Sequence, residues 1–90
     1  MSRSIWKFPL EVNHIQEVEM PVDAEILTIQ TQHGKPCIWA LVSPDAERKN
    51  RTFEVFGTGH VISNSKRTYI GTVQLQAGMW VFHVFERLNP

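Results

Sequence analysis

The chain has 90 residues, and its nine Lys and Arg residues balance nine Asp and Glu residues, so the formal net charge is zero. This length fits one domain, residues 1–90, and the charge balance argues against a dedicated nucleic-acid-binding protein, which needs an excess of cations. The single cysteine, Cys37, excludes an intrachain disulfide, and no Cys/His spacing is typical of zinc, so we expect neither a metal nor a cofactor.

Short runs of β-branched and aromatic residues, separated by Gly, Pro, Asn, Asp and Ser, are the main pattern along the chain. Such runs are typical of strands joined by turns. In chain order, the predicted strands are 4–8, 16–20, 24–32, 37–42, 52–56, 67–76 and 79–85. Because Pro9 cannot donate to a sheet, the first strand is predicted to end there or to lie at an edge.

The middle of the chain predicts a hairpin. Residues 33–36 read as a tight reversal between strands 24–32 and 37–42, with Gly34 supplying positive φ. Strand 37–42 is apolar throughout, which indicates a central strand covered on both faces. Residues 43–47 predict a charged loop with a short helical turn, and this loop is expected to continue through Asn50 and Arg51.

The last two strands are predicted to pair through a turn at Ala77 and Gly78. Alternation places Tyr69, Gly71, Val73 and Leu75 on one face of the sixth strand. In the seventh, Trp80, Phe82 and Val84 share one face, while Val81, His83 and Phe85 share the other. Residues 86–90 are expected to fray.

Together these elements predict an all-β fold, an antiparallel sandwich or small barrel of about seven short strands with little or no helix. Strands that are apolar on both faces require a second covering layer. That layer is either another sheet of this chain or another copy of it.

The most unusual segment is a glycine-flanked threonine followed by histidine. Its two glycines allow positive φ, so successive N–H groups can converge on an anion. The threonine adds a hydroxyl and the histidine an imidazole. The alternative is a glycine-bearing bulge that only bends the strand. The candidate ligand-binding residues here are Gly57, Thr58, Gly59 and His60.

Further candidates lie elsewhere in the chain. His83 suits proton transfer or a ligand contact, although a core histidine bonded to a carbonyl is the alternative. Aromatic side chains can stack on a flat ligand, and those considered are Trp6, Trp39, Tyr69 and Trp80. Of these, Trp6 is favoured because it stands beside Lys7 on the predicted edge strand. The basic residues able to neutralise phosphate are Lys7, Arg51, Lys66 and Arg67, and the alternative is ordinary solvated charge.

The sequence contains no complete catalytic constellation. Cys37 opens an apolar strand and is expected to be buried, while His14 and His33 fall in predicted turns. No serine lies in a nucleophile elbow. The chain has neither a signal-peptide pattern nor an apolar run of about 18 residues, so we expect a cytoplasmic protein with no membrane partner.

Five segments carry a family resemblance: residues 4–10 (SIWKFPL), 36–42 (PCIWALV), 57–60 (GTGH), 69–72 (YIGT) and 81–86 (VFHVFE). They resemble a family of small uncharacterised proteins encoded by tailed phages and prophages. The resemblance implies an accessory phage product made in the host cytoplasm. Such products often inhibit or sequester components of host defence.

Three functional hypotheses follow. The first is a non-enzymatic module that sequesters a small anionic ligand, such as a nucleotide signal of host defence. The second is a protein-interaction module that inhibits a host protein through an aromatic patch or a sheet edge. The third is a small hydrolase using His60 and His83 as acid and base. The neutral surface is also compatible with a homo-oligomer.

Overall fold

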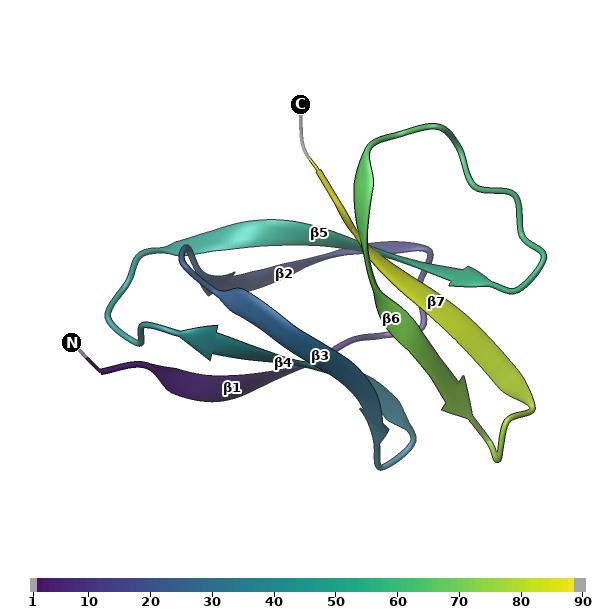
Figure 1. Cartoon of the computed structure of the whole chain (residues 1–90), viewed down its shortest axis with the longest axis horizontal. Coiled ribbons are helices and arrows are strands. Elements are labelled where there is room, and N and C mark those ends of the chain that lie inside the picture. Colours follow the sequence, from purple (N-terminus) through teal and green to yellow (C-terminus); the bar gives the residue numbers. More distant parts are fainter. Residues whose placement is uncertain (1, 89–90) are drawn as a thin grey trace.

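The structure, a computed structural model, describes residues 2–88 and contains two antiparallel sheets (Figure 1). One sheet has the order β1-β4-β3, and the other has the order β2-β5-β7-β6. No helix occurs within the described residues. The predicted all-β fold is confirmed, and the arrangement is the sandwich rather than a single closed sheet. The strands are β1 (Ser4–Pro9), β2 (Ile15–Pro21), β3 (Glu25–Gln32), β4 (Lys35–Val42), β5 (Arg48–Gly57), β6 (Arg67–Leu75) and β7 (Trp80–Arg87).

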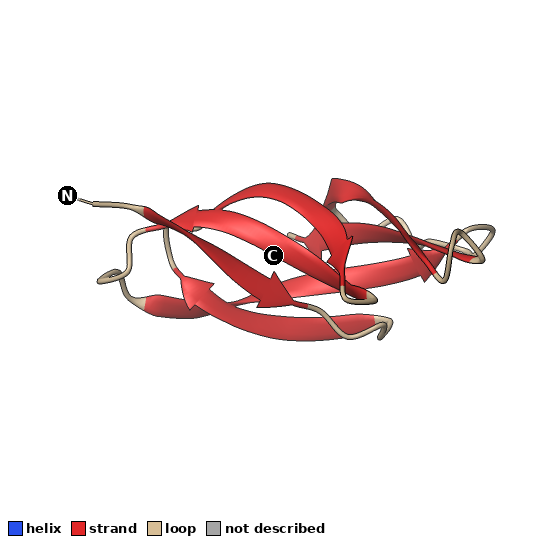
Figure 2. Ribbon diagram, turned by 90° about the horizontal axis from the view of Figure 1, so that it is seen from below, coloured by secondary structure: helices blue, strands red, loops and turns tan. Residues whose placement is uncertain are grey.

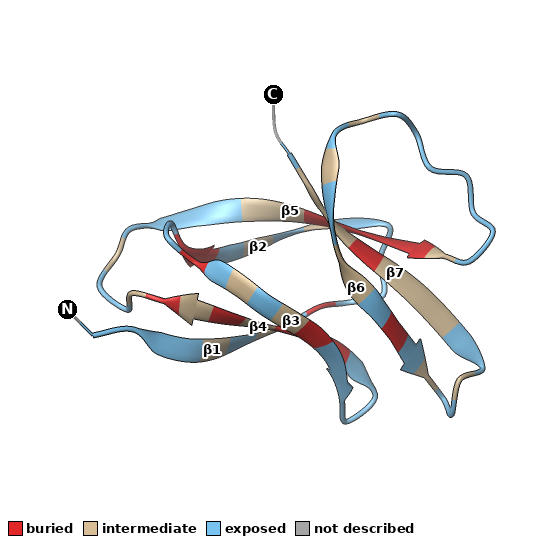
Figure 3. Ribbon diagram, viewed as in Figure 1, coloured by how far each residue is buried: buried red, intermediate tan, exposed pale blue. Residues whose placement is uncertain are grey.

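The two sheets lie face to face as two layers (Figure 2). Alternate residues of the central strands point between them and make the core, where the buried positions concentrate (Figure 3). β4 contributes Ile38, Ala40 and Val42, and the opposite sheet contributes Phe53 and Val84, all fully buried. The second sheet of the same chain therefore covers the inner face of β4, whereas Trp39 and Leu41 on its other face are only partly buried. No helix long and apolar enough to cross a membrane is found among residues 2–88.

The predicted β3–β4 hairpin is confirmed. Gln32 pairs with Lys35, so His33 and Gly34 alone form the loop. Both have positive φ, 52° and 77°, which is the backbone required by a two-residue turn that matches the twist of its strands. The β6–β7 turn is likewise built on left-handed residues, with Gln76, Ala77 and Gly78 at positive φ.

β5 is longer than predicted. Residues 48–51 were expected to belong to a charged loop, but they form strand paired with β2, with Arg48 opposite Pro21 and Asn50 opposite Glu19. These residues are mostly exposed, so their backbone pairing is not accompanied by an apolar signal in the sequence. The expected helical turn in 43–47 is instead a simple turn, in which the Ala46 amide donates to the Ser43 carbonyl at 3.0 Å.

The irregularity expected at residues 57–60 also takes another form. β5 ends at Gly57 rather than continuing through a bulge, and a bulge occurs in β6, between Tyr69 and Gly71. Because a bulge inserts one residue, it reverses the face of the side chains on one side of it. Tyr69 pairs with Phe85, while Gly71 pairs with Val84, so the predicted common face for these two β6 residues is wrong.

The last strand extends further towards the C-terminus than predicted. Residues 86–90 were expected to fray, but β7 continues to Arg87. The Leu88 amide donates to the Lys66 carbonyl at 3.1 Å, and Glu86 accepts two hydrogen bonds from Arg51 at 2.6 and 2.7 Å. Residues 89–90 lie outside the described part of the chain.

The edges of the two sheets meet where β3 and β6 lie side by side (Figure 1). Thr31 Oγ1 donates to the Gln74 carbonyl across this seam at 3.0 Å. A Cβ atom at Gly71 would lie 2.7 Å from Ile29 Cγ2, closer than real side chains approach. Only glycine therefore allows β6 to lie this close to the buried Ile29.

Gly71→Ala is expected to destabilise the fold by about 1–3 kcal/mol, because the new methyl group forces Ile29 or the β6 backbone to move. Urea denaturation measures this change. The double variant Gly71→Ala, Ile29→Ala tests the cause, since removing the Ile29 methyl groups makes room for the added one. Strictly additive costs in the double variant would contradict the steric explanation.

Candidate functional site

The corner after β5 is closed by its own hydrogen bonds. The His60 amide donates to the Gly57 carbonyl at 3.1 Å, and the Gly57 amide donates to His60 Nδ1 at 3.2 Å. Gly59 adopts φ +90°, which favours glycine at this position. A Cβ at Gly57 would lie 2.9 Å from His60 Cε1, so Gly57 makes room for the imidazole. The glycines thus have two different roles, one conformational and one steric.

This arrangement fixes the tautomer of His60. A neutral imidazole carries one proton, and the nitrogen that accepts a hydrogen bond cannot hold it. Since Nδ1 accepts from the Gly57 amide, the proton is on Nε2, which is a donor on an exposed side chain. The amides of Gly57 and His60 are occupied within the corner, so an anion bound as in a nest would have to use those of Thr58 and Gly59.

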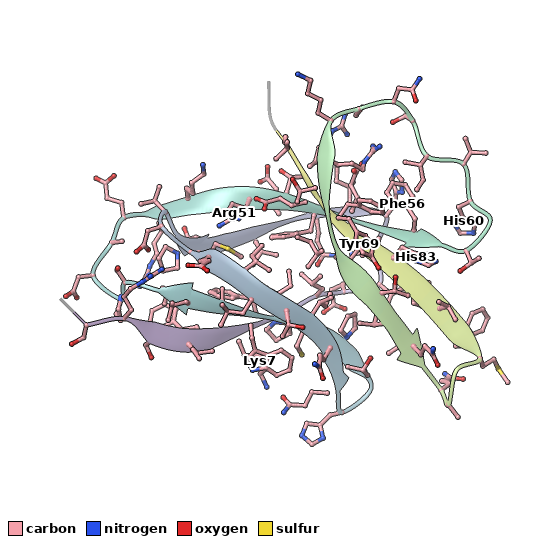
Figure 4. The ribbon with its side chains drawn as sticks, in the orientation of Figure 1. Lys7, Arg51, Phe56, His60, Tyr69 and His83 are labelled. Atoms are coloured by element: carbon pink, nitrogen blue, oxygen red, sulfur yellow. The ribbon has the colours of Figure 1, made fainter. Side chains whose placement is uncertain are left out.

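A chain of hydrogen bonds runs from the corner across the outer face of the four-stranded sheet, where Figure 4 labels His83 and Tyr69. Thr58 Oγ1 lies 2.7 Å from His83 Nε2. His83 Nδ1 lies 2.9 Å from Thr72 Oγ1, and the Tyr69 hydroxyl lies 2.5 Å from the same oxygen. The β6–β7 register makes this possible, because Thr72 stands directly opposite His83. Two predicted residues, Thr58 and His83, are therefore in direct contact. A third, Tyr69, is linked to them through Thr72, which was not predicted from the sequence.

A groove of about 450 Å³ opens beside the corner. Gly57, Thr58 and His60 line one side, and the beginning of β7 lines the other. Trp80 leaves half of its surface exposed and Met79 about three quarters, at 50% and 73%. A volume of a few hundred Å³ with a largely apolar wall and a few polar groups is typical of a small-molecule site. The β7 residues of the groove are Met79, Trp80, Val81 and Phe82.

Trp6 and Lys7 do not join this groove. Both lie on β1, in the other sheet, and Figure 4 shows Lys7 far from His60 and His83. The Trp6 ring packs against the core, with the Arg48 guanidinium 5.0 Å from its centroid. Lys7 Nζ donates to Gln32 Oε1 at 2.8 Å. The edge position predicted for β1 is confirmed, but it does not bring these side chains to the corner.

Glu54 binds two arginines that do not line the groove. Its carboxylate is buried on the outer face of the four-stranded sheet, 2.8 Å from Arg67 Nε and 3.6 Å from Arg87 Nη1. Arg67 also donates to the Ser63 carbonyl at 2.6 Å, and Arg87 donates to Ser65 Oγ at 3.2 Å. These contacts fasten the 58–66 loop to the sheet.

Arg51 is occupied between the sheets. It donates to Glu86 and to the Ala24 carbonyl, the latter at 2.6 Å, and the Glu86 carboxylate raises the pKa of Arg51 above its ordinary value. Two of the basic residues considered from the sequence therefore form ion pairs within the protein: Arg51 with Glu86 and Arg67 with Glu54. A ligand in the groove would be recognised mainly by neutral donors and by His60.

A row of aromatic rings lies outside the groove lining. It crosses the outer face of the four-stranded sheet, with centroid distances of 5.3, 5.8 and 5.4 Å between successive rings. The Arg67 guanidinium lies 5.5 Å from the Phe56 ring. Contacts of this kind add to the stabilisation from burial and restrict side-chain motion. In order, the rings are His14, Phe56, Phe85 and Tyr69.

Two other hollows are lined by residues outside the corner. One of about 500 Å³ is lined by residues that include Asp23, Ser43 and Asp45. Hydrogen bonds from the Ser43 hydroxyl and amide lower the pKa of Asp23, so this carboxylate already has partners. Another of about 270 Å³ lies along the β3–β6 seam. Among residues 2–88, no group of three or more His, Cys, Asp or Glu side chains is placed to hold a metal ion.

Comparison with known proteins gives one match. All 90 residues, 1–90, match a family described as a domain of unknown function, DUF7352. The chain belongs to this family. No curated protein and no solved structure matches it. Membership of DUF7352 thus groups the chain with its relatives but assigns no chemistry, so function must be argued from the groove itself.

Proposed function

We propose that this DUF7352 protein is a binding module that captures a small ligand combining a flat ring with a polar or anionic group, such as a nucleotide. The single observation that carries the proposal is the groove between the corner and β7. It sets the exposed Trp80 ring beside hydrogen-bonding groups of Thr58 and His60 in a hollow of ligand size. Stacking supplies affinity for any flat ring, and the donors select the group attached to it.

The groove also favours ligands whose charge is modest. Neither Arg67 nor Arg87 lines the groove, and both are bound to Glu54, so they do not offer free guanidinium groups to a polyphosphate held there. Amides at the corner, the Thr58 hydroxyl and the His60 imidazole suit a ligand with a single anionic or carbonyl group. A cyclic mononucleotide, with one phosphodiester charge and one base, has this chemistry.

Calorimetric titration of the full chain with a panel of cyclic and linear nucleotides and nucleosides tests the proposal. We expect saturable binding of at least one compound that carries both a base and a single charge. Absence of heat across the panel, at protein concentrations that detect millimolar affinity, would contradict it.

Trp80→Ala is expected to weaken such binding by about 1–3 kcal/mol, which raises Kd roughly five- to 150-fold, because the stacking surface is lost. Trp80→Phe should retain part of the affinity. Ile5→Ala removes an exposed apolar side chain of β1, outside the groove, and serves as the matched control. Equal affinities for the wild type and Trp80→Ala would place the ligand elsewhere.

The proposed context is that of an accessory phage protein acting in the bacterial cytoplasm, as the sequence resemblance implies. Capture of a nucleotide signal would then remove it from the host components that respond to it. A homo-oligomer stays a prediction from the neutral surface charge, and sedimentation analysis tests it.

A second candidate function is inhibition of a host protein through the same end of the molecule. Met79 and Trp80 in the groove are exposed apolar side chains, and so is Val61, which follows His60 in the chain and is 94% exposed. Such surface is typical of protein contacts, and Trp is common among residues that dominate them. Recovery of one host protein by the wild type and not by Trp80→Ala would favour this candidate over small-ligand capture.

A further inference from the structure

The Thr58 hydroxyl has the surroundings of an activated nucleophile. Its oxygen is 2.7 Å from His83 Nε2, within the range required for direct proton transfer. The residue stands exposed in a turn between two glycines, so a reacting group can approach its oxygen. A nucleophile bonded to a base, with that base held by a third group, is the geometry shared by hydrolases of unrelated folds.

Thr72 supplies the third group. It holds His83 Nδ1 at 2.9 Å, and its own oxygen is bonded to the Tyr69 hydroxyl. For His83 to accept the Thr58 proton at Nε2, the neutral ring must carry its proton on Nδ1 and donate it to Thr72. Thr72 then donates to Tyr69. In this order each hydrogen bond from His83 to Tyr69 joins one donor to one acceptor.

The groove also offers an electrophilic partner. The His60 Nε2 proton, fixed there by the Gly57 amide, belongs to a side chain that lines the same groove. Acyl transfer develops one negative charge on the carbonyl oxygen, which neutral donors stabilise. Phosphoryl transfer is served by cations around several oxygens, and here Arg67 and Arg87 are held by Glu54. The site is therefore suited to acyl rather than phosphoryl chemistry.

We propose that Thr58 is an acyl acceptor and that the groove hydrolyses esters of short carboxylic acids with aromatic alcohols. Thr58 Oγ bonds to the acyl carbon while its proton moves to His83 Nε2. The bond from the acyl carbon to the alcohol oxygen breaks, and that oxygen takes the proton from His83. Water then adds to the acyl carbon, giving a proton to His83, and the proton returns to Thr58 as its ester breaks. The balance is ester plus water to acid plus alcohol.

The roles of the other residues follow from this scheme. Trp80 offers its ring to the aromatic alcohol, and His60 Nε2–H is the donor available to the carbonyl oxygen. Thr72 is a positioning residue, since it acts through His83. Thr72→Val is expected to lower kcat with little change in KM, and Thr72→Ser, which keeps the hydroxyl, should restore kcat.

The test uses the purified full chain with p-nitrophenyl acetate. We expect faster release of nitrophenolate than from Thr58→Ala, and an acetyl group on Thr58 when the quenched protein is mapped by mass spectrometry. His83→Gln should slow acetylation about 100-fold or more through loss of the general base. The matched controls are Thr68→Ala, an exposed β6 threonine outside the chain of hydrogen bonds, and His33→Gln, an exposed turn histidine. Both should react as the wild type does, and circular dichroism verifies that each variant is folded.

Acetyl groups found only on lysine or histidine, or equal rates for the wild type and folded Thr58→Ala, would overturn the proposal. Its failure is separable from that of the proposed binding function, although both use the groove. Nucleotide binding without Thr58 acetylation refutes catalysis alone. Thr58 acetylation without binding of any nucleotide refutes the proposed ligand class alone.

Discussion

Glu54→Gln is expected to destabilise the protein by about 3 kcal/mol or more, one of the largest effects of any single substitution in the chain. The Glu54 side chain is 3% exposed and Arg67 is 8% exposed, so the pair is shielded from water. Glutamine has nearly the same shape but no charge, which leaves the Arg67 guanidinium buried without its counter-ion. The 58–66 loop, fastened by Arg67 and Arg87, should loosen as well.

Urea denaturation of the variant measures this cost as a fall in the transition midpoint. Glu19→Gln on the exposed side of β2 is the matched control, and it should change stability by no more than about 0.5 kcal/mol. A Glu54→Gln variant as stable as the control would show that the buried carboxylate does not hold the loop and the sheet together.

Phe53→Ala is expected to cost about 3–5 kcal/mol, because it opens a cavity between the sheets. Phe53 is fully buried in the core cluster, whereas its neighbour Glu54 points to the opposite face of the same strand. The stability of a domain of this size is on the order of 5–15 kcal/mol, so this loss takes a large share of the total.

Two further variants identify the cause of that loss. Phe53→Leu fills most of the cavity and should cost less than Phe53→Ala, while Val61→Ala, at a position 94% exposed, should leave the midpoint unchanged. Calorimetric melting compares the three. A loss below about 1 kcal/mol for Phe53→Ala would mean that the two sheets do not depend on this contact.

Much of the fold could be predicted because local and long-range signals agree. His33 and Gly34 form the turn that their sequence favours, and β7 alternates as its pattern indicates. The predicted strand bounds and side-chain faces are wrong where long-range pairing decides the structure. Polar residues 48–51 become strand through pairing with β2, and the bulge in β6 turns Tyr69 away from the face of Gly71.

The candidate site was only partly predictable for the same reason. The corner at residues 57–60 could be predicted, because a backbone with positive φ favours glycine and two glycines occur there. Trp6 and Lys7 are candidates because an aromatic and a cation stand together on a predicted edge strand, but sheet order places β1 beside β4 in the other layer. Thr72 escaped notice because its link to His83 depends on strand register. Met79 was missed because exposure of an apolar side chain in a turn has no sequence signal.

The most direct test of the account is an NMR titration of the labelled full chain with the nucleotide panel, following every backbone amide. We expect shifts concentrated at residues 57–60 and 79–83, with those of 36–42 in the opposite sheet unchanged. Shifts confined to residues 43–46, at the hollow beside Asp23, or no shifts with any compound, would contradict the claim that the groove beside the glycine corner is the binding site.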